Sequence, residues 1–221
     1  MQQLTSKNLK QLLDDPENNS GAIDGVLYDR NTIQPSVVHF GVGNFHRCHQ
    51  AVYMDRLLRR GSNEWGIIGV SMRSTSVRDA LKPQDFLYTE VTLGGQPRFR
   101  IIGSILDILV GPEDPSAVVN LVGETSTKLV TTTITEKGYC LSSGNPDHSD
   151  TGISADKTSL EKPKTIYGYL AAGIILRSDS DAGPLSIVCC DNIEAGGQTL
   201  RAGVYALLKI HVDGTVHLAE I

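Results

Sequence analysis

The stretch from Ser36 to Asp55 constrains the fold of this chain more than any other. Its sequence, SVVHFGVGNFHRCHQAVYMD, runs from a short apolar segment through a glycine turn into an amphipathic helical pattern. This order predicts a strand, a tight turn and a helix. Gly41 permits the reversal, and Gly43 lets backbone N–H groups approach a ligand without an intervening Cβ. Such a turn commonly binds the pyrophosphate of a dinucleotide.

The glycine pattern of this turn is incomplete. The third glycine of G-x-G-x-x-G is absent, and His46 occupies its place. On this pattern alone, two interpretations stay open: a dinucleotide site and an ordinary strand-to-helix turn.

Length and charge limit the class of protein. The chain has 221 residues, of which 40% are hydrophobic, enough for one large domain or for one domain and part of another. A net charge of −5 and the absence of any run of five Lys or Arg residues argue against nucleic-acid binding. The chain contains no signal-peptide core and no apolar stretch of about 18 residues, so we expect a cytoplasmic protein without a membrane span.

The first third of the chain predicts a lead-in and one strand–helix–strand unit. Residues 1–35 contain a helix near Ser6–Leu13 and then a polar loop, DDPENNSGA. The helix after the glycine turn should run to about Arg60, with Val52, Leu57 and Leu58 on its apolar face. Residues 65–70, WGIIGV, then read as a parallel strand. A dinucleotide-binding domain would therefore span residues 36–221.

The middle of the chain predicts an inserted hairpin. A short helix over residues 77–84 is followed by an alternating strand at 87–93, a Gly94-Gly95 turn and an antiparallel return at 98–102. Asp114 is placed to cap a helix that has Pro115 at its first position and runs to Val122.

The remaining residues alternate between strands and helices. The sequence predicts a central strand at 128–135, a long surface loop at 142–163, a helix at 165–177, a buried strand at 185–190 and a last helix at 198–210. We expect Tyr205 to pack on the apolar face of that last helix. The whole pattern indicates an α/β, doubly wound, mostly parallel sheet with an inserted antiparallel hairpin.

In such a sheet, ligands bind outside the carboxyl ends of the strands. Four segments follow predicted strands: residues 41–46, 71–73, 135–139 and 191–192. Each also has a purely structural interpretation. Asp191 and Asn192 could form a turn or a helix cap, and Glu136 could be a solvated loop charge.

Six strings in this order resemble the polyol-specific long-chain dehydrogenases, a family that includes mannitol 2-dehydrogenase and fructuronate reductase. The strings are HFGVGNFHRCHQAVYMDRLL, WGIIGV, QDFLYT, IIGSI, TITEKGYC and CCDNI. The combination of G-x-G-x-F-H-R, T-E-K-G-Y and C-D-N is more specific than any one of them. The resemblance covers about residues 36–221 and implies a Rossmann-like domain.

The resemblance also implies a reaction and its residues. Family enzymes interconvert a sugar alcohol or hexonate and its ketose or keto-hexuronate by hydride transfer with NAD. The pyrophosphate would bind at the turn formed by Gly41, Gly43, Asn44, Phe45 and His46. Asn192 would polarise the substrate carbonyl as a catalytic residue, because an amide N–H stabilises a developing alkoxide. Glu136 and Lys137 would lie near the nicotinamide.

The chain departs from the family pattern in two respects. It ends at Ile221, before the helical substrate domain that supplies the family's general acid/base lysine. It is therefore expected to be a fragment or a truncated product, and a catalytically silent nucleotide-binding domain is the alternative function. In addition, residues 70–77, VSMRSTSV, lack the acidic residue that selects NAD, and Arg73 lies there instead. NADP thus stays open beside NAD, and so does a merely solvated Arg73.

Other chemistries fit less well. His46, Cys48 and His49 lie on one short helix start, whereas zinc sites of polyol dehydrogenases draw ligands from separated segments, so we predict no metal site. Tyr205 and Lys209 match the Y-x-x-x-K pair of short-chain dehydrogenases, but the glycine turn of that group is absent. The expected partner is a small-molecule substrate. The resemblance favours a monomer.

Overall fold

A computed structural model describes residues 4–14 and 23–212. The chain divides into two compact units, residues 1–109 and 110–221. The polar loop predicted from Asp14 onward falls mostly at residues 15–22, and the chain end at 217–221 lies beyond residue 212, so both are outside the described residues. The domain boundary predicted at residue 36 stays a prediction.

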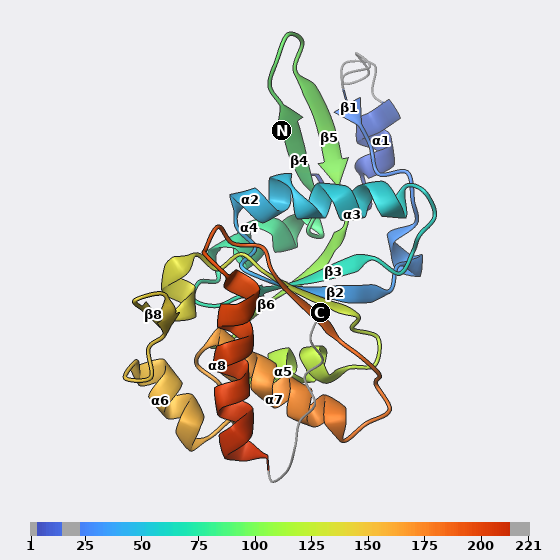
Figure 1. The fold of residues 1–221 in the computed structure, drawn as a ribbon. Coiled ribbons are helices and arrows are strands. Elements are labelled where there is room, and N and C mark those ends of the chain that lie inside the picture. The colour runs from blue at the N-terminus through green and yellow to red at the C-terminus, as the bar shows by residue number, and fades with distance from the viewer. Residues whose placement is uncertain (1–3, 15–22, 213–221) are drawn as a thin grey trace. The chain divides into compact units, whose positions relative to one another are not determined.

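The first unit is built around parallel strands joined by helices. β2 pairs in parallel with β3, and β6 follows β3 in the strand order. β4 and β5 form the antiparallel hairpin that the sequence predicts, and β1 pairs with β5 (Figure 1). The elements are α1 Leu9–Asp14, β1 Ile23–Asp24, β2 Pro35–Phe40, α2 Asn44–Cys48, α3 Gln50–Leu58, β3 Gly66–Ser71, α4 Ser76–Leu81, β4 Tyr88–Thr92, β5 Arg98–Ile102 and β6 Ile105–Val110, with 3-10 turns at Arg30–Thr32 and Lys82–Gln84.

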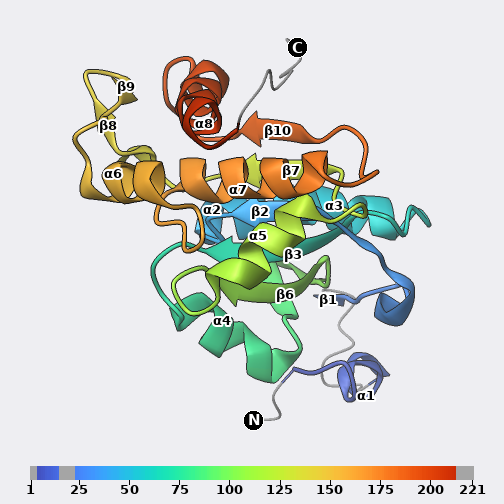
Figure 2. The same cartoon turned by 90° about the horizontal axis from the view of Figure 1, so that it is seen from below.

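The second unit contains one parallel strand pair and four helices within its described part. β7 and β10 pair in parallel, with Thr132 opposite Cys189. Helices α5 and α7 lie side by side, and α8 lies beside β10 (Figure 2). The elements are α5 Pro115–Gly123, β7 Leu129–Thr132, the 3-10 turn η3 Glu136–Tyr139, β8 Leu141–Ser142, β9 Asn145–Pro146, α6 Thr151–Thr158, α7 Ile166–Ser178, β10 Ser186–Cys189 and α8 Gly196–His211.

Several predicted elements are confirmed with their local causes. The Asp114 carboxylate accepts the Ala117 N–H at 2.9 Å and caps α5, which begins at Pro115. Thr165 caps α7 by accepting the Gly168 N–H. These side chains satisfy N–H groups that have no partner within the helix, and so they fix where each helix begins.

The helix predicted from the glycine turn to Arg60 is instead two helices. His49, between α2 and α3, has φ −125° and ψ −84°, outside the helical region. The Tyr88 hydroxyl donates to the Arg47 carbonyl at 2.7 Å, and that carbonyl would accept the fourth N–H along an unbroken helix. The break therefore leaves α2 only five residues long.

Asp55 is the buried charged residue of α3. Its carboxylate accepts the Tyr28 hydroxyl at 2.5 Å and the Gly103 N–H at 3.1 Å, and it pairs with Arg59 at 2.5 Å. Arg59 also pairs with Asp24. A fully buried carboxylate needs such partners, because an unpaired one is costly. The helical face that was predicted from apolar residues alone thus includes a charge.

Three predictions for the second unit are wrong. Residues 142–163 contain α6 and most of the β8–β9 pair. The Asp150 carboxylate accepts the N–H groups of Gly152 and Ile153 and so starts a helix in a polar segment. β10 is not a buried strand, since its side chains alternate between exposed and half-buried and Val188 is 44% exposed. Tyr205 is 36% exposed, with the Lys209 ammonium 4.5 Å from its ring centre.

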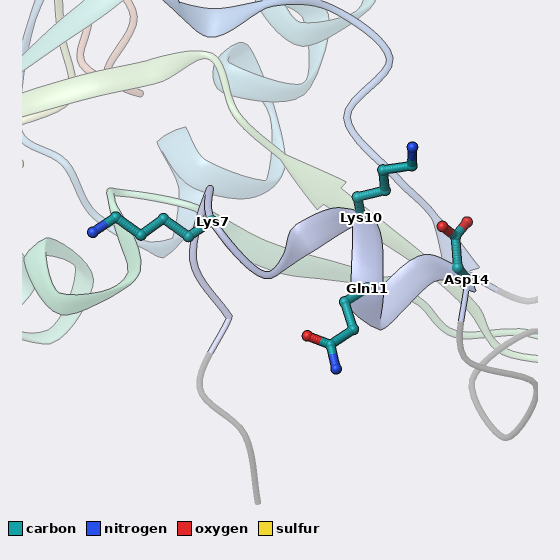
Figure 3. A pocket seen from close by; sticks show the side chains of 4 residues that line it. All are labelled: Lys7, Lys10, Gln11 and Asp14. Carbon is teal, nitrogen blue, oxygen red and sulfur yellow. The ribbon is translucent and has the colours of Figure 1, made fainter.

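A surface hollow lies beside α1. Lys7, Lys10, Gln11 and Asp14 line it, and in Figure 3 Lys7 and Gln11 point away from Lys10. No helix within residues 4–14 and 23–212 is long and apolar enough to cross a bilayer.

Candidate functional site

The turn after β2 is fixed by Gly41. Its φ of +98° is in the region that favours glycine, and its N–H donates to the Val70 carbonyl at 2.9 Å. The Gly43 N–H donates back to the Gly41 carbonyl at 2.7 Å. A side chain at position 41 would strain this reversal.

Gly43 has a different reason to be glycine. Its φ of −80° suits any residue, and a Cβ built there would have only the Gly41 carbonyl oxygen within 4 Å, at 3.9 Å. Neither the backbone nor the packing of the described residues therefore requires glycine at this position. The open space fits a ligand that approaches the backbone closely, as a pyrophosphate does.

The Arg47 side chain stabilises the turn through two hydrogen bonds. Its guanidinium donates to the Val42 carbonyl at 2.7 Å and to the side-chain oxygen of Asn44. Asn44 and Phe45 are themselves exposed, and the Phe45 ring, 57% exposed, stacks on His49 at 4.9 Å. Arg47 was not among the predicted site residues, although the G-x-G-x-F-H-R string contained it.

Two buried histidines lie beneath the turn. The rings of His39 and His46 stack with centres 3.4 Å apart and planes 11° from parallel. Burial lowers the pKa of His46 to about 4, against the weaker opposite effect of its hydrogen bond to Gln50. Burial, and then the neighbouring His46, lower the pKa of His39 well below its ordinary value. The pair is therefore neutral near pH 7, and Nε2 of His46 has no hydrogen-bond partner among the described residues.

The segment after β3 contains Arg73, which is exposed. The Ser71 hydroxyl donates to the Ser74 carbonyl at 2.5 Å and shapes this turn. The nearest acid downstream, Asp79, lies in α4 and pairs with Arg78 at 2.9 Å. This turn thus presents a cation where an acid would select NAD.

In the second unit, Asp191 binds the loop that follows β7. Its carboxylate accepts the Ile134 N–H at 2.8 Å, the Thr135 N–H at 3.1 Å and the Tyr139 hydroxyl at 2.6 Å. Thr135 has φ +63° and ψ +161°, a conformation found almost only in glycine. One carboxylate thus holds both ends of the T-E-K-G-Y string.

The predicted side chains Glu136, Lys137 and Asn192 are all exposed. Glu136 and Lys137 begin the 3-10 turn η3, and Asn192 directly follows Asp191. The Asn192 side chain makes no hydrogen bond to another described residue.

A protein family described as the mannitol dehydrogenase Rossmann domain matches residues 35–218. The chain belongs to this family. As a mannitol dehydrogenase Rossmann domain it has the predicted α/β fold, and the predicted family is confirmed.

Relatives and solved structures agree with this assignment. A polyol:NADP oxidoreductase of Gluconobacter oxydans is 34% identical over 93% of the chain, and a mannitol 2-dehydrogenase of Pyrenophora tritici-repentis is 34% identical over 90%. The structure of Pseudomonas fluorescens mannitol 2-dehydrogenase with NAD and D-mannitol matches 95% of the chain with a TM-score of 0.85 and 31% identity. The chain spans 42%, 35% and 43% of the length of these three proteins.

Within this mannitol dehydrogenase Rossmann domain, the predicted site residues other than Arg73, which follows β3, form two groups. The glycine turn, Gly41 to His46, is one local structure of the first unit. Glu136 and Lys137 are joined to Asn192 through Asp191, in the second unit. Sequence reasoning missed Asp191 and Tyr139 as the residues that join them, although both lay inside the quoted strings.

Proposed function

We propose that this chain is the cofactor-binding part of an NAD-dependent oxidoreductase that interconverts a sugar alcohol and its ketose. The observation that carries the proposal is the likeness, over 95% of the chain, to an enzyme whose structure contains NAD and D-mannitol. The relatives' names support an enzyme over the alternative of a catalytically silent nucleotide-binding domain.

The glycine turn is assigned to the cofactor's pyrophosphate. The space beside Gly43 is not filled by any described residue. Gly41 has the positive φ that lets the backbone reverse direction. Asn44, Phe45 and His46 complete the turn, and Arg47 braces it. Because α2 has only five residues, its dipole contributes little, and the backbone N–H groups of the turn carry most of the attraction.

The chemical step is assigned to the second unit. The cofactor supplies the hydride acceptor and donor when bound. The Asn192 amide N–H is proposed to donate to the substrate oxygen as negative charge develops there. Glu136 and Lys137 would border the nicotinamide. We assign no residue of this chain as the general acid, which by the family resemblance belongs to a helical substrate domain.

The choice between NAD and NADP depends on Arg73. NAD is supported by the structure with bound NAD, whereas the Gluconobacter relative is named for NADP. An exposed arginine at this turn can pair with a 2′-phosphate, and the turn lacks an acid that would repel one. We propose NAD as the cofactor and NADP as the alternative.

The substrate is proposed to be a polyol of the mannitol type, with a hexonate and its keto-hexuronate as the second candidate. Mannitol is supported by the names of several relatives. A cytoplasmic monomer remains our proposal for the location and assembly of the protein.

Binding and turnover measurements test the proposal. The purified chain should bind NADH, measured by its fluorescence, and tighter binding of NADPH would assign the cofactor instead to NADP and a role to Arg73. The full-length natural polypeptide that contains this chain should oxidise NADH with D-fructose, and a rate with D-fructuronate alone would move the substrate to the hexuronates. If the folded chain binds neither nucleotide, the proposal is wrong.

A further inference from the structure

Asp191 connects the ends of two parallel strands. It lies two residues after β10, and its two carboxylate oxygens accept N–H groups from Thr135 and Ile134, just beyond β7. Its neighbour Asn192 and the loop residues Glu136 and Lys137 are otherwise exposed. This carboxylate therefore links the segment that carries Asn192 to the loop that carries Glu136 and Lys137.

The Asp191 contact falls at a residue of the loop with an unfavourable backbone conformation. Thr135 adopts backbone angles that cost a non-glycine residue about 1–3 kcal/mol. Hydrogen bonds to a charged acceptor are about twice as strong as neutral ones, and the two backbone N–H groups point at the same carboxylate. The contact thus offsets strain at the residue that precedes Glu136.

Tyr139 fixes the other end of the loop. It is fully buried, its hydroxyl donates to Asp191, and the Thr132 hydroxyl lies 2.7 Å away, positioned to donate to Tyr139 in turn. The Tyr167 hydroxyl donates to the Tyr139 carbonyl at 2.7 Å. Burial and then the hydrogen bond to Asp191 raise the pKa of Tyr139, and so it stays a neutral donor at all ordinary pH values.

We propose that Asp191, together with Tyr139, is a positioning residue for the nicotinamide half of the cofactor. It would hold residues 135–137 and Asn192 at a fixed spacing without touching the reacting atoms. This inference rests on the proposed function, because that function assigns the nicotinamide to this loop.

The test compares two nucleotides that differ only at the reacting end. NADH carries nicotinamide, and ADP-ribose lacks it. In Asp191→Asn, one amide hydrogen would face a backbone N–H, so one hydrogen bond to the loop would be lost. We therefore expect the affinity for NADH to fall about tenfold, and the affinity for ADP-ribose to change less than about twofold. Tyr139→Phe removes one contact and should lower NADH affinity by a smaller factor.

Asp150→Asn is a matched control. Asp150 is also half-buried and also accepts two backbone N–H groups, from Gly152 at 2.8 Å and Ile153 at 3.1 Å, but it caps α6. The change should lower the melting temperature much as Asp191→Asn does and leave the binding of both nucleotides unaltered.

The binding of NADH and ADP-ribose by these variants can contradict the positioning role in two ways. Equal losses of NADH and ADP-ribose affinity, or no loss of either, in Asp191→Asn would overturn the positioning role. If Asp191→Asn does not fold, Tyr139→Phe decides in the same way. A folded wild-type chain that binds neither NADH nor NADPH would instead overturn the proposed function, and the inference with it.

Discussion

The turn after β2 and the loop after β7 both follow a parallel strand, but they are held by different means. The first has glycine at its positive φ, and its side-chain contact, from Arg47 to Val42, spans five residues, while one backbone bond joins Gly41 to Val70. The second has a threonine at positive φ and is held by a carboxylate 56 residues further along the chain. The side-chain contacts of the first turn therefore form between neighbours in sequence, whereas those of the second loop require the pairing of β7 with β10 first.

The two also differ in electrostatics. Beneath the first turn, the stacked His39 and His46 are buried and neutral. The second depends on an acid that accepts three hydrogen bonds. Lowering the pH should therefore destabilise the first structure through its two histidines.

The largest expected effect is a loss of stability between about pH 6.5 and 4. Because burial lowers the pKa of His46 to about 4, the unfolded chain binds a proton in this range and the folded chain does not. The contribution is complete above pH 6.5 and is lost as the pH falls, by about 3 kcal/mol. His46→Phe should remove this contribution and leave that of His39, so that the plot of unfolding free energy against pH becomes less steep in this range.

His148→Gln is the control for the pH experiment, since His148 is exposed. Its curve should run parallel to that of the wild type. If His46→Phe gave the same slope as the wild type, the result would contradict a buried, neutral His46 in the stack with His39.

A second comparison separates the two glycines of the first turn. Gly43→Ala should leave the free energy of unfolding within about 0.5 kcal/mol of the wild type, because its Cβ enters only open space. It should weaken NADH binding at least about tenfold, because that space is the one proposed for the pyrophosphate. Gly41→Ala should lower stability by about 1–2 kcal/mol as well, owing to its positive φ. Unchanged NADH binding by Gly43→Ala would mean that the nucleotide does not use this space.

The smallest expected effect is a gain. Thr135→Gly should raise the free energy of unfolding by about 1 kcal/mol, since glycine adopts these angles without strain. Thr135→Ala keeps a Cβ and should give no such gain. Denaturant unfolding of the two variants tests this, and a glycine variant less stable than the alanine variant would show that Thr135 is unstrained.

The same contrast explains what the sequence could predict. The strand, glycine turn and helix start between Ser36 and Asp55 could be predicted because their pattern lies in neighbouring residues. The resemblance of the six strings to a known family then predicted the function. The role of Asp191 depends on the register that sets Thr132 opposite Cys189, which no local pattern reveals. In α6, Ile153 and Asp156 are the buried residues, so its polar sequence resembled a loop.

The hydrogen bond between Tyr28 and Asp55 has a practical consequence for anyone expressing this protein. The family match begins at residue 35, which invites a recombinant version cut at that point. Such a version would lose Tyr28, and with it Asp24, the second partner of Arg59. A fully buried carboxylate would then lack one of its donors, at a cost of about 1–3 kcal/mol. The preceding segment should be kept, because it completes the interior of the first unit.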